Sequence, residues 1–167
     1  MPATTTTGMP ERMGPVLLRV SGHSMEPALR PGDLLLALPL RGRRGDLVVL
    51  DRPSGVRYVK RVAAVAGDVV ELEAGRLRVN GRPLDGRPRV AGPVVGSWTV
   101  PPGAVFVAGD NPLASADSRT WPDPFVPAGS TRRVLRVSPG GWGAAGVEGF
   151  RRQPGTPRLK GMSAGRP

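Results

Sequence analysis

Cysteine is absent from this sequence, and His23 is its only histidine. The lack of cysteine excludes disulfides and thiolate metal sites. With one histidine, an imidazole metal site and a Ser-His-Asp triad are both difficult to assemble. We therefore expect no metal and no other cofactor, and any catalysis must depend on other side chains.

Lysine is also scarce, because only Lys60 and Lys160 are lysine among the 24 lysine and arginine residues. Arginine stays protonated near neutral pH, whereas a lysine in apolar surroundings can lose its proton. Lys60 lies in the segment Tyr58–Ala66, the most apolar neighbourhood of any basic residue in the chain. Burial there would lower the pKa of the amine and make Lys60 a candidate general base. The ordinary alternative is a lysine whose stem packs while its head reaches water.

Long apolar runs are missing too, and aromatic residues are few. The longest apolar runs, among them Leu34–Leu38 and Val62–Ala66, are far shorter than the ~20 residues of a membrane-spanning helix. Residues 1–14 contain no apolar core of secretory length, so we expect a soluble chain. The net charge is +11, but the basic residues are dispersed and aromatic residues make up only 4%. A specific nucleic-acid partner is therefore not expected, although a basic β-barrel that binds nucleic acid is the alternative from another functional class.

Glycine and proline are abundant, at 24 and 20 residues, and they separate short runs of valine, leucine and alanine. Glu73-Ala74-Gly75-Arg76 and Asn80-Gly81 are typical hairpin turns. No stretch has a sustained helical period. Strands are expected at Val16–Val20, Asp33–Leu38, Leu47–Leu50, Val56–Ala66, Val69–Leu72, Leu77–Val79, Ser97–Val100, Ala104–Ala108 and Val134–Val137.

These strands predict an all-β domain of folded-over antiparallel sheets, barrel-like, over residues 15–137. A flexible N-terminal arm is expected over residues 1–14. A disordered, basic tail rich in glycine and proline is expected over residues 138–167.

One serine lies in a sharp turn, Ser21–Pro27. A strand stops at Ser21-Gly22 and Pro27 turns the chain away, so Ser24 should be exposed beside backbone N–H groups that can point at an oxyanion. His23 is poorly placed as its base, because neighbouring residues of an extended chain point to opposite faces. Alone, such a serine is ordinarily structural.

A second turn, within Val107–Arg119, carries a hydroxyl, a carboxylate and a guanidinium at the alternate positions Ser115, Asp117 and Arg119. An Asp–Arg pair can brace a loop, and a serine can orient a neutral lysine amine by accepting its hydrogen bond. By itself this pattern is typical of a polar surface loop.

Together and in this order, these segments resemble the type I signal peptidases, the S26 family of serine peptidases. Ser24-Met25-x-Pro27-x-Leu29-x-x-Gly32-Asp33 is similar to the family's nucleophile box. Tyr58-Val59-Lys60-Arg61-Val62, continuing to Gly67-Asp68, is similar to its general-base box. Gly109-Asp110-Asn111, with Ser115 and Asp117-Ser118-Arg119, is similar to its final box. The resemblance covers about residues 16–137.

The resemblance implies that Ser24 attacks the scissile carbonyl, and that Lys60 takes its proton and returns it to the leaving amine. The Ser24 backbone N–H would donate to the oxyanion, and Ser115 would orient the Lys60 amine. Asp110, Asp117 and Arg119 would brace the site. The implied partner is a protein precursor, cut after small residues in a small-x-small pattern to remove a signal or propeptide, with peripheral membrane contact.

Some features depart from the family pattern. Many relatives carry a hydroxyl two residues before the nucleophile, but this position is Gly22, so the second oxyanion donor is unassigned. The segment Thr120–Phe125 is longer than its usual counterpart. The family's N-terminal membrane anchor is not seen in residues 1–14, which sets a soluble, cytoplasmic location against the membrane association that the family implies. A specialised maturation peptidase fits the length better, such as the short relatives that process nickel superoxide dismutase precursors in actinobacteria.

The nearest alternative is a LexA-type self-cleaving peptidase, which also pairs a turn serine with a strand lysine. That class lacks the Gly-Asp-Asn…Asp-Ser-Arg box and usually follows a DNA-binding domain, which residues 1–15 cannot form. No Ala-Gly-like cleavage site is evident upstream of Ser24. An inactive homologue that acts as a scaffold is a further alternative, against which the intact Ser24 and Lys60 argue.

Overall fold

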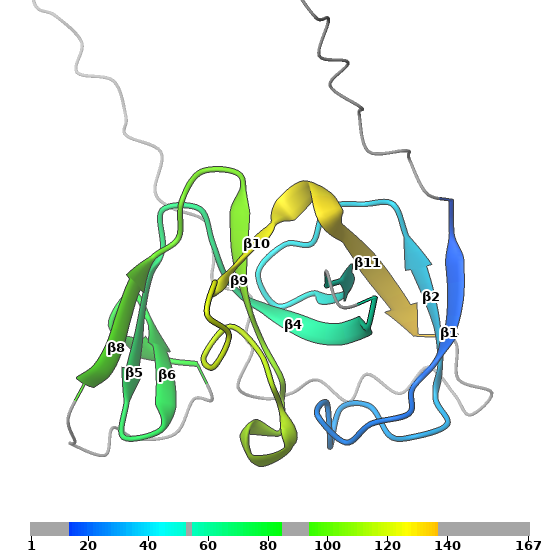
Figure 1. The fold of residues 1–167 in the computed structure, drawn as a ribbon, viewed down its shortest axis with the longest axis horizontal. Coiled ribbons are helices and arrows are strands. Elements are labelled where there is room, and N and C mark those ends of the chain that lie inside the picture. The colour runs from blue at the N-terminus through cyan, green and yellow to red at the C-terminus, as the bar shows by residue number, and fades with distance from the viewer. Residues whose placement is uncertain (1–13, 53–54, 85–93, 137–167) are drawn as a thin grey trace, which may run out of the picture.

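The computed structural model describes residues 14–52, 55–84 and 94–136, and these form two antiparallel sheets (Figure 1), as the sequence predicts. The predicted tail and almost all of the predicted N-terminal arm lie outside the described residues. The elements are β1 (Val16–Arg19), β2 (Leu34–Leu38), β3 (Leu47–Asp51), β4 (Arg57–Val65), β5 (Val69–Glu73), β6 (Arg76–Val79), β7 (Arg82–Pro83), β8 (Val94–Thr99), β9 (Ala104–Ala108), η1 (Pro112–Ala114), β10 (Phe125–Pro127), η2 (Ala128–Ser130) and β11 (Thr131–Arg136).

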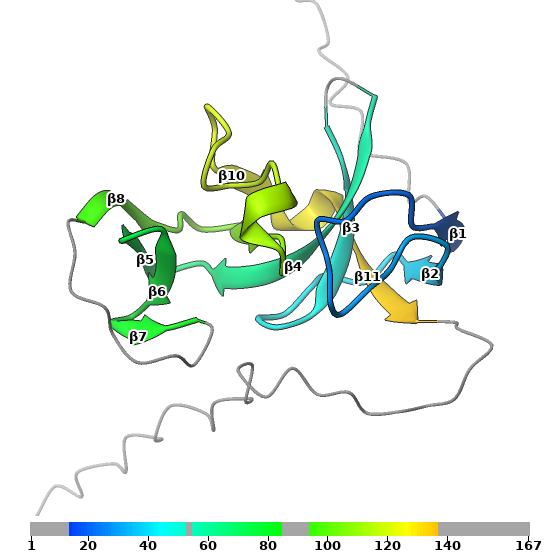
Figure 2. The same cartoon turned by 90° about the horizontal axis from the view of Figure 1, so that it is seen from below.

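The larger sheet has the order β1-β2-β11-β3-β4-β9-β10 and curls into a half-barrel, seen from two sides in Figures 1 and 2. Its strands come from both ends of the chain, since β11 pairs with β2 and with β3. Two buried clusters line it, one around Leu35 and Val49 and the other around Val48 and Val62. Neighbouring residues of one strand thus face different clusters, as strand alternation requires.

The smaller sheet has the order β7-β6-β5-β8, and its strands β5, β6 and β7 form two successive hairpins. Ala74 and Gly75 join β5 to β6, and Asn80 and Gly81 join β6 to β7, all with positive φ as in type I′ turns. A third buried cluster, which includes Val70 and residues of β4 and β9, packs the two sheets together. The predicted hairpins are therefore present, and the smaller sheet is attached through the strands that border the candidate site.

Gly-Asp occurs four times in the sequence, and three of these pairs form the same kind of turn. In each, the glycine has positive φ and the aspartate accepts a hydrogen bond from the backbone N–H three residues earlier. The bonds join Arg30 N to Asp33 (3.1 Å), Arg43 N to Asp46 (3.0 Å) and Val65 N to Asp68 (2.8 Å). The fourth pair, Gly109-Asp110, differs, because Gly109 does not have positive φ and both carboxylate oxygens of Asp110 bind the Arg61 guanidinium.

The strand predictions erred mainly towards the C-terminus. β11 begins at Thr131 rather than Val134, and β10 was not predicted. Arg132 and Arg133 interrupt the apolar pattern, but Asp51 and Asp46 pair with them from β3 and the loop before it, at 3.3 and 3.2 Å. Within the described ranges, no helix has the length and apolar character that crossing a membrane would require.

Candidate active site

Lys60 lies in the middle of the longest strand, β4, between β3 and β9. Its residue is only 2% exposed, and it pairs directly with the fully buried Val48 of β3. Tyr58 lies two residues earlier on the same face, with the Lys60 Nζ atom 5.7 Å from its ring centroid. The sheet therefore buries the Lys60 side chain, next to Val48 in the pairing and beside the ring of Tyr58.

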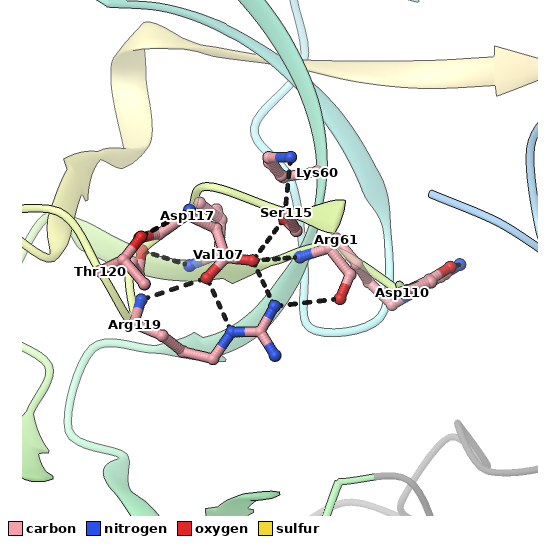
Figure 3. A network of polar contacts seen from close by, with 10 residues as sticks. Lys60, Arg61, Val107, Asp110, Ser115, Asp117, Arg119 and Thr120 are labelled. Carbon is pink, nitrogen blue, oxygen red and sulfur yellow. Dashed lines mark hydrogen bonds and ion pairs between the residues drawn. The ribbon is translucent and has the colours of Figure 1, made fainter. Parts of the chain in front are cut away.

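The Lys60 amine begins a chain of hydrogen bonds (Figure 3). Its Nζ donates to Ser115 Oγ at 3.0 Å, and Ser115 Oγ donates to Asp117 Oδ2 at 2.6 Å. Ser115 is thus an acceptor for the lysine because its own proton is directed to the carboxylate. The structure brings together three residues that the sequence predicted for one site.

Asp117 is the centre of this network and is fully buried. It accepts hydrogen bonds from Gly109 N and Arg119 Nε, both at 2.8 Å, and from Arg119 N at 3.2 Å (Figure 3). Burial alone would raise the pKa of Asp117, but the bonds from Arg119, Gly109 and Ser115 outweigh it and hold that pKa below its usual range. Asp117 is therefore a fixed anion that braces the loop.

The pKa of Lys60 is lowered, chiefly because burial disfavours its charged form. Asp117 and Asp110 oppose the shift, whereas the positive charge of Arg119 adds to it. Since Arg119 pairs with Asp117, the carboxylate nearest to the amine is largely compensated. The amine can thus lose its proton more readily than a lysine in water, as a general base requires.

Arg61 follows Lys60 on β4 and points to the opposite face. Its guanidinium binds Asp110 with two bonds, Nε to Oδ1 at 2.8 Å and Nη2 to Oδ2 at 2.5 Å, and its Nη1 binds the Gly45 carbonyl at 2.8 Å. Asp110 is therefore linked to β4 by Arg61, and it makes no bond to Asp117. Sequence reasoning placed Arg61 in a motif but gave it no role.

Ser24 lies in the turn between β1 and β2, beside the loop that follows β9. Its carbonyl oxygen accepts a hydrogen bond from Asn111 N at 3.0 Å. A Cβ atom added to Gly109 would lie 2.6 Å from this oxygen and 2.2 Å from Ser115 Oγ. The backbone of Ser24 and the hydroxyl that binds Lys60 thus converge on one glycine, and the three predicted segments meet there.

The residues around Ser24 complete the turn. His23 is exposed, and its ring contacts Glu26, with Nδ1 3.1 Å from Glu26 Oε1. Met25 and Leu29 point inward and belong to the buried cluster around Leu35, which anchors the turn.

In the part of the chain that the structure describes, no group of three or more acidic, histidine or cysteine side chains could hold a metal.

Comparison with known proteins gives a consistent picture. The family described as "Signal peptidase, peptidase S26" matches residues 15–132. The chain is 38% identical over 121 residues to "Signal peptidase I" of Bacillus caldolyticus, covering 60% of this chain and 66% of that protein. It is 30% identical over 159 residues to "Signal peptidase I" of Pseudomonas fluorescens, with 65% and 56% covered. It is 32% identical over 124 residues to "Signal peptidase I T" of Bacillus subtilis (strain 168), with 60% and 61% covered.

The chain thus spans between 56% and 66% of the length of these relatives. The family match, by contrast, covers well over half of the chain and includes Ser24, Lys60 and the whole Asp117 network. On this match the protein belongs to the signal peptidase family, peptidase S26.

Proposed function

We propose that this protein is a serine endopeptidase that removes an N-terminal signal or propeptide by cutting after small residues. Ser24 is the nucleophile and Lys60 the general base. The observation that carries the proposal is the buried amine of Lys60, with its lowered pKa and its bond to Ser115, at the point where the Ser24 turn meets Gly109.

The proposed reaction transfers one proton back and forth. Uncharged Lys60 Nζ accepts the proton of Ser24 Oγ as the oxygen attacks the scissile carbonyl. Collapse of the tetrahedral intermediate breaks the C–N bond, and the Lys60 ammonium returns the proton to the leaving amine. Water then attacks the ester, with its proton passing through Lys60 to Ser24 Oγ as the ester bond breaks.

Ser115 orients the amine in this reaction. It accepts one N–H of Lys60, which leaves the nitrogen lone pair free for the proton of Ser24. Because the Ser115 proton is directed to Asp117, the hydroxyl cannot compete for that lone pair. Asp117, Arg119 and Asp110 act as bracing residues, and the Ser24 N–H donates to the oxyanion.

The substrate proposal rests on the relatives, whose printed name is signal peptidase I. The partner is a protein precursor with a small-x-small sequence before the bond. Peripheral membrane contact is also proposed, and an apolar row across β1, β2 and β11 supports it. Leu36 pairs with both Leu17 and Leu135, which are 64% and 46% exposed and lie on the same face.

The test uses the purified full chain and a peptide with Ala-x-Ala before the scissile bond, with cleavage followed by mass spectrometry. Ser24→Ala and Lys60→Arg should each lower kcat/KM by about 10³-fold or more. Lys60→Arg keeps the charge but removes the ability to act as a base.

The matched controls are Ser130→Ala, at an exposed serine far along the chain, and Lys160→Arg, at the other lysine. Both should cleave like the original protein. Circular dichroism checks that all variants are folded. Full activity in a folded Ser24→Ala or Lys60→Arg variant would refute the proposed dyad.

A further inference from the structure

Asn111 contacts two successive carbonyl groups of the Ser24 turn. Its backbone N donates to Ser24 O at 3.0 Å, and its side-chain Nδ2 donates to His23 O at 3.2 Å. The second bond joins residues 88 positions apart in the sequence. Asn111 is thus the residue through which the loop after β9 holds the backbone around Ser24.

The side chain of Asn111 does not cap the turn that follows it, as an asparagine at this position usually does. Asn111 immediately precedes η1, where an asparagine side chain normally accepts a backbone N–H of the following turn. It makes no such capping bond here. Because a carbonyl oxygen can only accept, the amide nitrogen must be the atom that faces His23.

This contact fixes one peptide plane. The peptide bond between His23 and Ser24 is trans, so the His23 C=O and the Ser24 N–H point in opposite directions. The His23 carbonyl also accepts from Glu26 N at 3.2 Å. With both lone pairs of this oxygen engaged, the peptide cannot rotate without losing two hydrogen bonds, and the Ser24 N–H is held pointing away from Asn111.

The support behind Asn111 is itself rigid. The preceding residue, Asp110, is held by two bonds from Arg61, whose residue is 8% exposed. Arg61 is adjacent to Lys60 on β4. One short piece of strand therefore determines both the position of the amine and, through Asp110 and Asn111, the orientation of the Ser24 backbone.

We propose that Asn111 is a positioning residue that keeps the Ser24 N–H aimed at the oxyanion. The inference rests on the proposed peptidase function. The requirement is severe here, because Gly22, two residues before Ser24, carries no hydroxyl that could act as a second donor. The Ser24 N–H is the one donor to the oxyanion that this proposal assigns.

The sharpest test is Asn111→Asp, which preserves shape and the backbone bond to Ser24 O but turns a carboxylate oxygen towards the His23 carbonyl. We expect kcat to fall about 100-fold, while KM stays within about twofold of the original value. The matched control is Leu113→Ala, in the same loop at a residue that is 99% exposed, and it should leave both constants unchanged.

A peptide aldehyde separates orientation of the oxyanion donor from a general structural role. It adds to Ser24 and forms a tetrahedral oxyanion, so its affinity should fall in Asn111→Asp by the same factor as kcat/KM. The corresponding uncleavable peptide, which forms no oxyanion, should bind both proteins equally. An unchanged kcat, or a loss that appears in KM and not in aldehyde affinity, would overturn the proposal.

Failure of the proposed function would be recognised separately, because the unmodified chain would then cleave no peptide. In that case amide hydrogen exchange over residues 21–30 decides whether Asn111 holds the turn. Exchange should be faster in Asn111→Asp than in the unmodified protein and in Leu113→Ala. Equal protection in all three would refute the role of Asn111.

Discussion

The two sheets of this protein are assembled in different ways. The four-stranded sheet is built within one stretch, Val69 to Thr99, and tight turns join three of its strands, β5, β6 and β7. The seven-stranded sheet pairs strands from opposite ends of the chain, as β11 does with β2. All the proposed site residues lie on the seven-stranded sheet or its loops. Local turns are enough for a hairpin, but chemistry between distant side chains requires distant strands to pair.

The largest effect is expected in the seven-stranded sheet, on neutralising the buried anion at the centre of the network. Asp117→Asn leaves the mostly buried Arg119 without its charged partner. We expect a loss of about 3–5 kcal/mol in the free energy of unfolding, measured by urea denaturation at pH 7. Arg57→Gln, which breaks an exposed pair with Asp51, should cost about 1 kcal/mol or less. Equal losses in both variants would contradict the central role of Asp117.

The close approach at Gly109 gives the next largest effect. In Gly109→Ala the new methyl must displace Ser115 Oγ or the Ser24 carbonyl. A shift of about 1 Å in catalytic groups can lower the rate about 100-fold, and peptide cleavage should show this. Gly129→Ala is the matched control, because nothing lies within 4 Å of its added Cβ. Retention of activity in Gly109→Ala would mean that the segments need not meet so closely.

Burial of Lys60 in the larger sheet should set the pH dependence of cleavage. Burial lowers the pKa of Lys60, and only the uncharged amine can accept a proton. The rate kcat/KM should therefore rise with pH up to the lowered pKa of Lys60, and fall about tenfold for each pH unit below it. A profile measured with a peptide that has no titrating groups tests this. A rate independent of pH on the acid side would exclude Lys60 as the base.

The smallest effect is expected in the four-stranded sheet. Ala74 has φ of 48°, which an asparagine tolerates better in an Asn-Gly turn of type I′. Ala74→Asn should raise the free energy of unfolding by about 0.5 kcal/mol and leave cleavage unchanged. A change in activity would show that the two sheets are coupled more tightly than their separate construction suggests.

The sequence predicted best what its neighbouring residues determine. The turn at Ala74-Gly75 and the apolar surroundings of Lys60 can be predicted from local sequence. A glycine indicates the positive φ of the turn, and neighbouring valines and alanines indicate burial. The alternation of Ser115, Asp117 and Arg119 likewise indicated a braced loop. The contact of Ser115 with Lys60 could be expected only from the family resemblance, since no local pattern joins residues 55 positions apart.

What sequence reasoning missed depends on distant partners. The start of β11 contains two arginines that are unfavourable in an apolar strand until Asp46 and Asp51 are beside them. The roles of Arg61 and of the Asn111 side chain were missed for the same reason. Asn111 looks like an ordinary turn residue, and its bond to His23 joins residues 88 positions apart, which no local pattern indicates.

Lys60 and Arg61 are consecutive on β4, so their side chains lie on opposite faces of the strand. The register of β4 therefore decides which of the two basic groups lies at the site. A slip of one residue would bring a guanidinium, which cannot give up its proton, to the position of the amine. The pairing of β4 with β9 has an irregularity between Val62 and Ala64. This irregularity disfavours a slipped register, because a slip would move it to another position on the strand. Accurate folding of this strand is thus a condition for the chemistry as much as for stability.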